Sequence, residues 1–197
     1  IFNANGTPAT NDFTIASRPV DGSHFDIQNV SATLLPNGNV VVGYPESYYG
    51  TGTNLPYFSI VDPTTGSVVA EVPIAINTSH PWPGPPLIET LGNSGYFVAV
   101  YANGDAYSGG TYGLNYRIFD SNGNPVTGEI ALVGGSLNSS VSGIDSFDWS
   151  NIDVVYNATA KTFVVSWVGN HDGSGTGVFT SGPIDVSALV TPLQHDE

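Results

Sequence analysis

The chain has 197 residues, 40% of them hydrophobic and only 10% charged, so it is long enough to bury a core and is typical of a folded protein. Seventeen acidic residues oppose three cations, and this net charge of −14 disfavours nucleic acid and anionic membranes as partners. Cysteine is absent, which excludes disulfides and thiolate metal sites, and no apolar run is long enough for membrane insertion.

Short apolar segments, rich in β-branched and aromatic residues and separated by Gly and Pro, predict an all-β fold. The first hairpin is expected over residues 1–15. A strand, an Asn37-Gly38 turn and a second strand follow over residues 32–44, and another hairpin then joins residues 57–62 to 68–75. This layout of two hairpins returns over residues 87–101 and 118–133, and its first half returns again over 154–168. The only helical feature expected is a turn near residues 184–190.

The repeat predicts four-stranded antiparallel sheets that resemble the blades of a β-propeller. Gly6, Gly66 and Gly123 mark equivalent turns, and the segment IFNANGTPATNDFTIA at residues 1–16 matches IFDSNGNPVTGEIALV at residues 118–133. We expect an incomplete blade that contributes only its outer hairpin (1–26), three blades (27–78, 86–135 and 144–190) and a tail (191–197). About three and a half units are too few to close a ring, so the chain is expected to be a fragment or to complete its sheet with another chain.

Three segments resemble the blade repeats of large secreted bacterial proteins, namely the RTX or haemolysin-type calcium-binding proteins and related adhesins. Residues 163–167 are similar to the valine-rich strand that ends in tryptophan, and Asp120, Gly123 and Pro125 to the hairpin of those repeats. The glycine-rich loop of those repeats is matched by Asp172, Gly173, Ser174, Gly175 and Gly177. The resemblance implies a propeller-like architecture and a secreted setting, either extracellular or at the cell surface.

Candidate ligand sites lie in the loops that follow the buried strands. Oxygen donors amid glycines could bind Ca²⁺ in two of these loops, although the same residues are also ordinary turn formers; they are Asn103, Asp105, Asp172 and Ser174. No cofactor is expected to be required. Aromatic side chains in polar loops could stack on sugar rings or could instead fold back over the core; they are Tyr48, Tyr49, Trp82, Tyr107 and Tyr112. Sequons that could carry glycans begin at Asn5, Asn29, Asn77, Asn138 and Asn157.

The leading hypothesis is a non-enzymatic structural or adhesive module, either a segment of a large surface protein or a subunit that assembles by strand addition. Its partners would then be other protein chains or glycans. A carbohydrate-binding, lectin-type propeller is the alternative, with or without calcium. A glycosidase would need two facing carboxylates in a pocket. The acidic residues considered for that role are Asp26, Glu46, Glu89, Asp145, Asp148 and Asp153.

Overall fold

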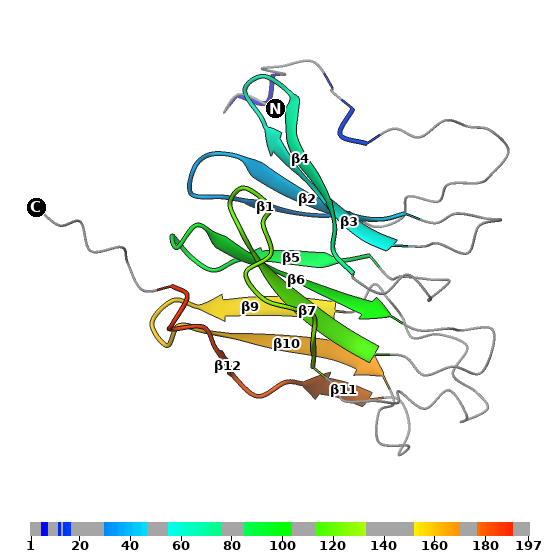
Figure 1. Ribbon diagram of the computed structural model, residues 1–197, viewed down its shortest axis with the longest axis vertical. Coiled ribbons are helices and arrows are strands. Elements are labelled where there is room, and N and C mark those ends of the chain that lie inside the picture. Colours follow the sequence, from blue (N-terminus) through cyan, green and yellow to red (C-terminus); the bar gives the residue numbers. More distant parts are fainter. Residues whose placement is uncertain are drawn as a thin grey trace, which may run out of the picture.

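The structure is a computed structural model that describes residues 5–7, 12, 14–16, 30–46, 55–75, 85–103, 113–132, 152–169 and 177–190. Its twelve described strands form three four-stranded antiparallel sheets (Figure 1), and the described residues contain no helix. The all-β class and the repeated four-stranded sheets are therefore confirmed. We call the three sheets sheet 1, sheet 2 and sheet 3 in chain order.

Sheet 1 contains β1 (Ser31–Leu34), β2 (Val40–Glu46), β3 (Leu55–Asp62) and β4 (Ser67–Pro73), in the spatial order β1-β2-β3-β4. The Asn37-Gly38 turn between β1 and β2 works as the sequence predicts, because Gly38 has a φ of 90°. The amide of Leu35 closes this turn on the carbonyl oxygen of Asn39 at 2.8 Å.

Sheet 2 repeats this order with β5 (Leu87–Thr90), β6 (Tyr96–Asn103), β7 (Gly113–Asp120) and β8 (Ile130–Ala131). The fourth strand is much shorter than its counterpart in sheet 1. Residues 126 and 127 both donate backbone hydrogen bonds to the Ile118 carbonyl oxygen, so the chain bulges before β8 begins.

Sheet 3 contains β9 (Ile152–Asn157), β10 (Thr162–Gly169), β11 (Gly177–Thr180) and β12 (Ile184–Asp185). Here the order differs, because β11 and β12 both pair with β10, at its two ends. Since β9 already pairs with residues 162–167 of β10, β11 and β12 must share the other edge. They form one interrupted third strand, and the described residues contain no strand outside it.

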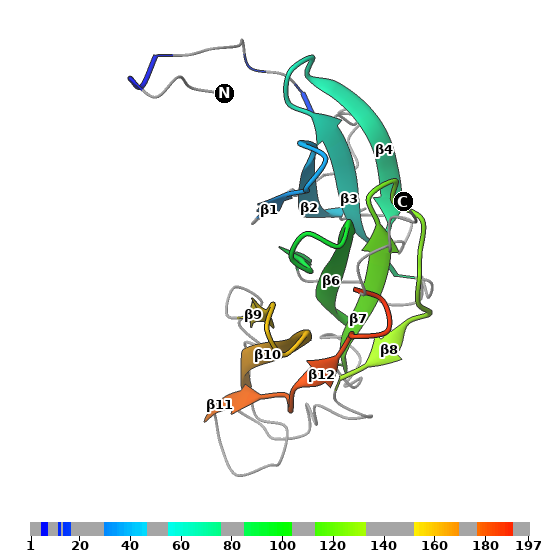
Figure 2. The ribbon, with the colours of Figure 1, turned by 90° about the vertical axis from the view of Figure 1, so that its left-hand side faces the viewer.

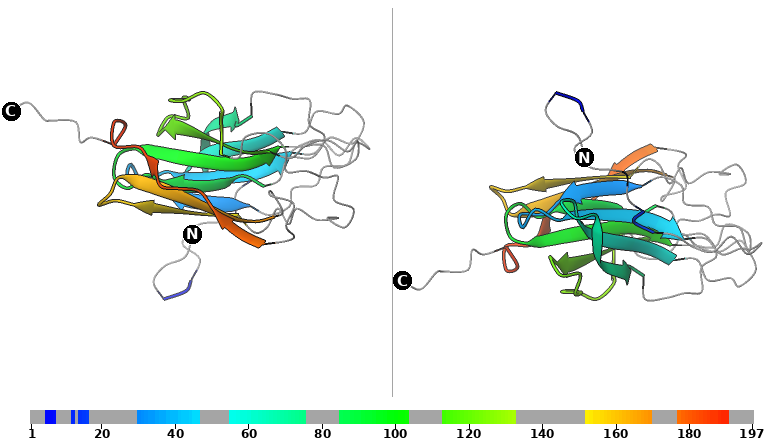
Figure 3. Two further views of the ribbon diagram at one scale, coloured as in Figure 1. Left: turned by 90° about the horizontal axis from the view of Figure 1, so that it is seen from below. Right: turned by 90° about the horizontal axis from the view of Figure 1, so that it is seen from above.

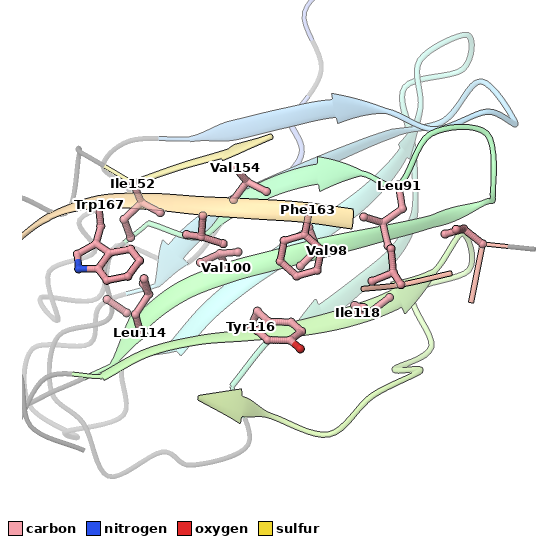
Figure 4. Packing of buried hydrophobic residues seen from close by; sticks show 14 residues of the cluster. Leu91, Val98, Val100, Leu114, Tyr116, Ile118, Ile152, Val154, Phe163 and Trp167 are labelled. Atoms are coloured by element: carbon pink, nitrogen blue, oxygen red, sulfur yellow. The ribbon is translucent and has the colours of Figure 1, made fainter. Parts of the chain in front are cut away.

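The three sheets stack face to face, with sheet 2 in the middle (Figures 1 and 2). Side chains alternate between the two faces of a strand, so residues 97, 99 and 101 of β6 pack on sheet 1 and residues 98, 100 and 102 pack towards sheet 3. Phe58 of sheet 1 meets Phe97 and Phe119 of sheet 2 at centroid distances of 5.1 and 4.8 Å. Figure 4 shows the second interface, where Phe163 lies against Tyr116 at 5.3 Å.

The glycine corners of the repeat are confirmed, because Gly6, Gly66 and Gly123 have φ angles of 81°, 73° and 87°. The helical turn expected near the end of the chain is a single turn, in which the amides of Leu189 and Val190 both donate to the Val186 carbonyl oxygen. The first hairpin stays a prediction. Of its residues the structure describes 5–7, 12 and 14–16, and these lie in no strand.

Candidate functional site

Most of the loop residues that the sequence singles out lie outside the described residues. This holds for the proposed calcium ligands Asp105, Asp172 and Ser174, and for all five proposed sugar-binding aromatics, Tyr48, Tyr49, Trp82, Tyr107 and Tyr112. Asn103 is described only as the last residue of β6. The calcium and sugar hypotheses stay predictions. Within the described part of the chain, no three His, Asp or Glu side chains are grouped so that they could hold a metal ion.

Two of the five sequon asparagines are described: Asn5 lies in an exposed turn, and Asn157 is the exposed last residue of β9. The side-chain oxygen of Asn157 accepts hydrogen bonds from the amides of Thr159 and Ala160, each at 3.0 Å. The side-chain oxygen of Asn5 accepts from the Thr7 hydroxyl at 2.7 Å. Both sequons are therefore accessible, and their use stays a prediction, as it does for Asn29, Asn77 and Asn138, which lie outside the described residues.

Three of the acidic residues considered for a glycosidase are described, namely Glu46, Glu89 and Asp153. Glu46 is buried at the end of β2. Glu89 on β5 and Asp153 on β9 lie on strands that pack together, and partial burial, followed by the negative charge of Asp153, raises the pKa of Glu89. Asp26, Asp145 and Asp148 lie outside the described residues. Among the described residues there is no helix that is long and apolar enough to cross a membrane.

An aspartate ends the third strand of every sheet. These aspartates are a common reference point from which equivalent residues of the three sheets can be compared. Asp62, Asp120 and Asp185 each accept a hydrogen bond from the amide two residues later, at 2.8, 2.9 and 2.8 Å. The hydrogen bond from the Thr64 hydroxyl, followed by that from the Thr64 amide, lowers the pKa of Asp62, and the bond from the Ser187 amide lowers the pKa of Asp185. For Asp120, partial burial opposes the effect, but hydrogen bonds led by the one from Asn124 keep its pKa low. Asp120 therefore stabilises its turn through these hydrogen bonds.

Strand pairing relative to these aspartates identifies equivalent residues on the second strands of the three sheets. The residue before each aspartate pairs with Val40, Phe97 or Phe163, and four residues further along lie Tyr44, Tyr101 and Trp167. All three are buried. Trp167 stacks on Phe179 at 6.2 Å, and Tyr44 stacks on Tyr57 at the same centroid distance.

A glutamate at the fourth strand of sheets 1 and 2 lies beside this ring. In sheet 1 the Tyr44 hydroxyl donates to Glu71 Oε1 at 3.0 Å and also bonds the Ser59 hydroxyl at 3.0 Å. In sheet 2, Glu129 Oε1 accepts from Asn115 Nδ2 at 2.9 Å. Burial, followed by the nearby Glu129 carboxylate, raises the pKa of Tyr101, although the Tyr101 hydroxyl makes no hydrogen bond with the described residues.

Three residues after each glutamate, the fourth strand is anchored in the same way. The amide of Ile74 donates to the Pro56 carbonyl oxygen, and the amide of Leu132 donates to the Leu114 carbonyl oxygen, both at 2.8 Å. Pro56 and Leu114 pair with the residues that follow Tyr44 and Tyr101. The fourth strands of sheets 1 and 2 therefore share a sequence pattern over residues 71–74 and 129–132. It is an acidic residue, an apolar residue, any residue, and then Ile or Leu.

Sheet 3 has the same acceptor positions on the outer side of β11, where the described residues contain no further strand, and we call this side the open edge. Val178 pairs with Val168, the residue after Trp167, so it is the counterpart of Pro56 and Leu114. Leu114 is fully buried because it packs in the core between sheets 2 and 3, whereas Val178 lies on the outer face of sheet 3 and is 79% exposed. Phe179 and Ser181 face β10, where the Ser181 amide donates to the Val165 carbonyl oxygen at 2.8 Å. The backbone groups of Val178 and Thr180 must therefore point away from β10. Figure 3 (left) views the molecule from the end at which sheet 3 lies.

The sequence pattern did not reveal that residues 177–185 form one interrupted strand. Pro183 has no amide hydrogen and falls between β11 and β12, so the pairing breaks there. The sequence did contain a sign that residues 184–185 belong to the third strand. The pair Ile184-Asp185 resembles Phe119-Asp120, which ends the third strand of sheet 2.

Comparison with known proteins identifies no family, since no family model and no curated protein matches the chain. Among solved structures, the chain is similar to an endo-arabinase from Bacteroides thetaiotaomicron, with a TM-score of 0.49 and 13% sequence identity. The match covers 92% of this chain and 62% of the endo-arabinase chain, so this chain spans less than two thirds of that protein.

Proposed function

We propose that this protein is a non-enzymatic, extracellular structural or adhesive module that joins other protein chains by adding a strand to sheet 3. The observation that carries the proposal is the outer edge of β11, beside which the described residues contain no further strand. The backbone groups of Val178 and Thr180 point to this edge, whereas the carbonyl oxygen of the counterpart Leu114 in sheet 2 accepts the amide of Leu132 at 2.8 Å. An exposed strand edge is a template for pairing with another chain.

The surface next to this edge supports the same function. On the face of sheet 3 that points away from sheet 2, Val155 pairs with Val164 and Val168 pairs with Val178. Val155 is 61% exposed and Val178 is 79% exposed, so an added strand would extend a face that already carries exposed apolar side chains. The rest of the stack is rigidly packed, because two continuous apolar cores join the three sheets.

The experiment is to measure the mass of the native protein in solution over a wide concentration range, by light scattering or sedimentation. We expect assembly that depends on concentration. Thr180→Pro removes an edge amide while leaving the pairing of Phe179 and Ser181 with β10 intact, so this variant should assemble at least tenfold more weakly. Thr180→Val is the matched control, because it keeps the amide and should assemble like the native chain.

Two results would overturn the proposal. One is a lone monomer at every concentration that also fails to bind peptides of fourth-strand sequence. The other is assembly of Thr180→Pro that equals assembly of Thr180→Val.

A further inference from the structure

The strand added at β11 can be identified from the chain's own sequence. We propose that it is residues 12–15 of a second copy of this chain, Asp12-Phe13-Thr14-Ile15, docking beside Trp167 and Val178 of sheet 3. This inference rests on the proposed function, since it names the partner that the open edge receives.

The sequence of residues 12–15 fits the pattern of the two fourth strands in the structure. Those strands have the sequences Glu71-Val72-Pro73-Ile74 and Glu129-Ile130-Ala131-Leu132. Each has an acidic residue at the first position and large apolar residues at the second and fourth. The spacing from the preceding turn agrees as well, because Asp12 follows Gly6 by the same number of residues as Glu129 follows Gly123. Both glycines have a positive φ, 81° and 87°.

The described residues of this segment are available for pairing. Asp12, Thr14, Ile15 and Ala16 lie in no strand, and Asp12 and Thr14 are exposed. Residues 14–16 lie at the sheet 1 end of the stack and β11 at the opposite end, in two views at right angles (Figures 1 and 2). The segment is therefore placed to reach the sheet 3 edge of a neighbouring copy rather than that of its own chain.

The receiving edge offers a partner for each feature of the segment. The Val178 carbonyl oxygen is the counterpart of the acceptors that bind Ile74 and Leu132, so it would accept the Ile15 amide. The Ile15 side chain would cover Val178. The Asp12 carboxylate would lie where Glu71 lies in sheet 1, beside the Trp167 ring, which takes the place of Tyr44. Figure 4 shows the indole nitrogen of Trp167 pointing away from the aliphatic side chains of the core.

Because the donor segment and the receiving edge lie at opposite ends, the contact is heterologous. Each copy would donate to one neighbour and receive from another, so assembly would continue into a ring or a filament.

The test is a complementation experiment with two full-length variants. Ile15→Asp should lose the donor strand and keep the receiving edge, and Thr180→Pro should do the reverse. We expect each variant alone to remain monomeric at a concentration tenfold above that at which the native chain assembles. An equimolar mixture should give one-to-one heterodimers that stop there. Thr14→Val is the matched control for the donor segment and should assemble like the native chain.

The outcomes separate this inference from the proposed function. If Ile15→Asp still assembles while Thr180→Pro does not, the edge is the assembly site but the proposed occupant is wrong. If both variants still assemble, both proposals are wrong. If the native chain is monomeric but its edge binds a synthetic peptide of residues 66–75, the edge stands and the N-terminal occupant is overturned. Unfolding temperatures that match the native chain confirm that both variants are folded.

Discussion

The hydroxyl of Tyr44 on β2 reaches across β3 to donate a hydrogen bond to the Glu71 carboxylate on β4, over 3.0 Å. The same hydroxyl lies 3.0 Å from the hydroxyl of Ser59 on β3, so a single side chain joins three strands of sheet 1. The contact is mostly buried, since Tyr44 is 3% exposed and Ser59 is fully buried.

Removing this hydroxyl should weaken the fold. Tyr44→Phe keeps the ring but leaves the buried Ser59 hydroxyl without this contact, and such a loss costs about 1–3 kcal/mol. We expect the free energy of unfolding, measured in urea, to fall by that amount. The double variant Tyr44→Phe with Ser59→Ala should recover part of the loss, because both polar partners are then gone. A single variant with native stability would contradict the role of this contact.

Two glycine turns allow the cost of backbone strain to be separated from the cost of crowding. Gly38 and Gly123 have similar φ angles of 90° and 87°, but only a Cβ at Gly123 would meet neighbours, the closest being Val72 Cγ2 at 3.2 Å. Gly38→Ala should therefore lose about 1–2 kcal/mol from strain alone. Gly123→Ala should lose more, because its methyl group would also press on the core of sheet 1. Equal losses in urea unfolding would show that the Gly123 turn does not pack as described.

Glu89 should destabilise the fold at neutral pH. Burial and the charge of Asp153 raise its pKa in the folded state above the ordinary value of 4.5, so the folded protein binds the proton more tightly than the unfolded chain does. Stability from this group is therefore present below pH 4.5 and is lost as the pH rises through the folded pKa. Glu89→Gln should raise the unfolding temperature at pH 7 relative to the native chain, and the difference should shrink towards pH 4. Asp153→Asn should act in the same direction but less strongly. A lower unfolding temperature for Glu89→Gln at pH 7 would contradict this assignment.

Asp120 should have the opposite dependence on pH. Its pKa lies below the ordinary value of 3.8 in the folded state, so the stability that its charge contributes is present above pH 3.8 and is lost as the pH falls through the folded pKa. Asp120→Asn keeps a side-chain oxygen for the turn but removes the charge. We expect the variant to unfold at a lower temperature than the native chain at pH 6, and the two curves to converge below pH 3. Parallel curves across that range would show that the charge has no such role.

Much of the fold follows from local sequence. The Asn37-Gly38 and Asp120–Gly123 turns require glycine at a positive φ, and the alternation of apolar residues on either side sets the strands and their faces. Such features depend on a few neighbouring residues, so they can be read directly from the chain. The repeat of these features along the chain predicts the all-β, four-stranded architecture.

The open edge of sheet 3 could not be derived in this way. Residues 177–180 and 184–185 look like two separate strands, and only their pairing with opposite ends of β10 shows that they share one position. Likewise, Val178 resembles any other strand valine in the sequence, and only the strand pairing shows that it occupies the position at which Leu114 accepts the Leu132 amide. Local chemistry thus determines the strands and turns of this protein. Which edge of a sheet stays uncovered depends on contacts between segments far apart in the chain, and those exist only in the folded molecule.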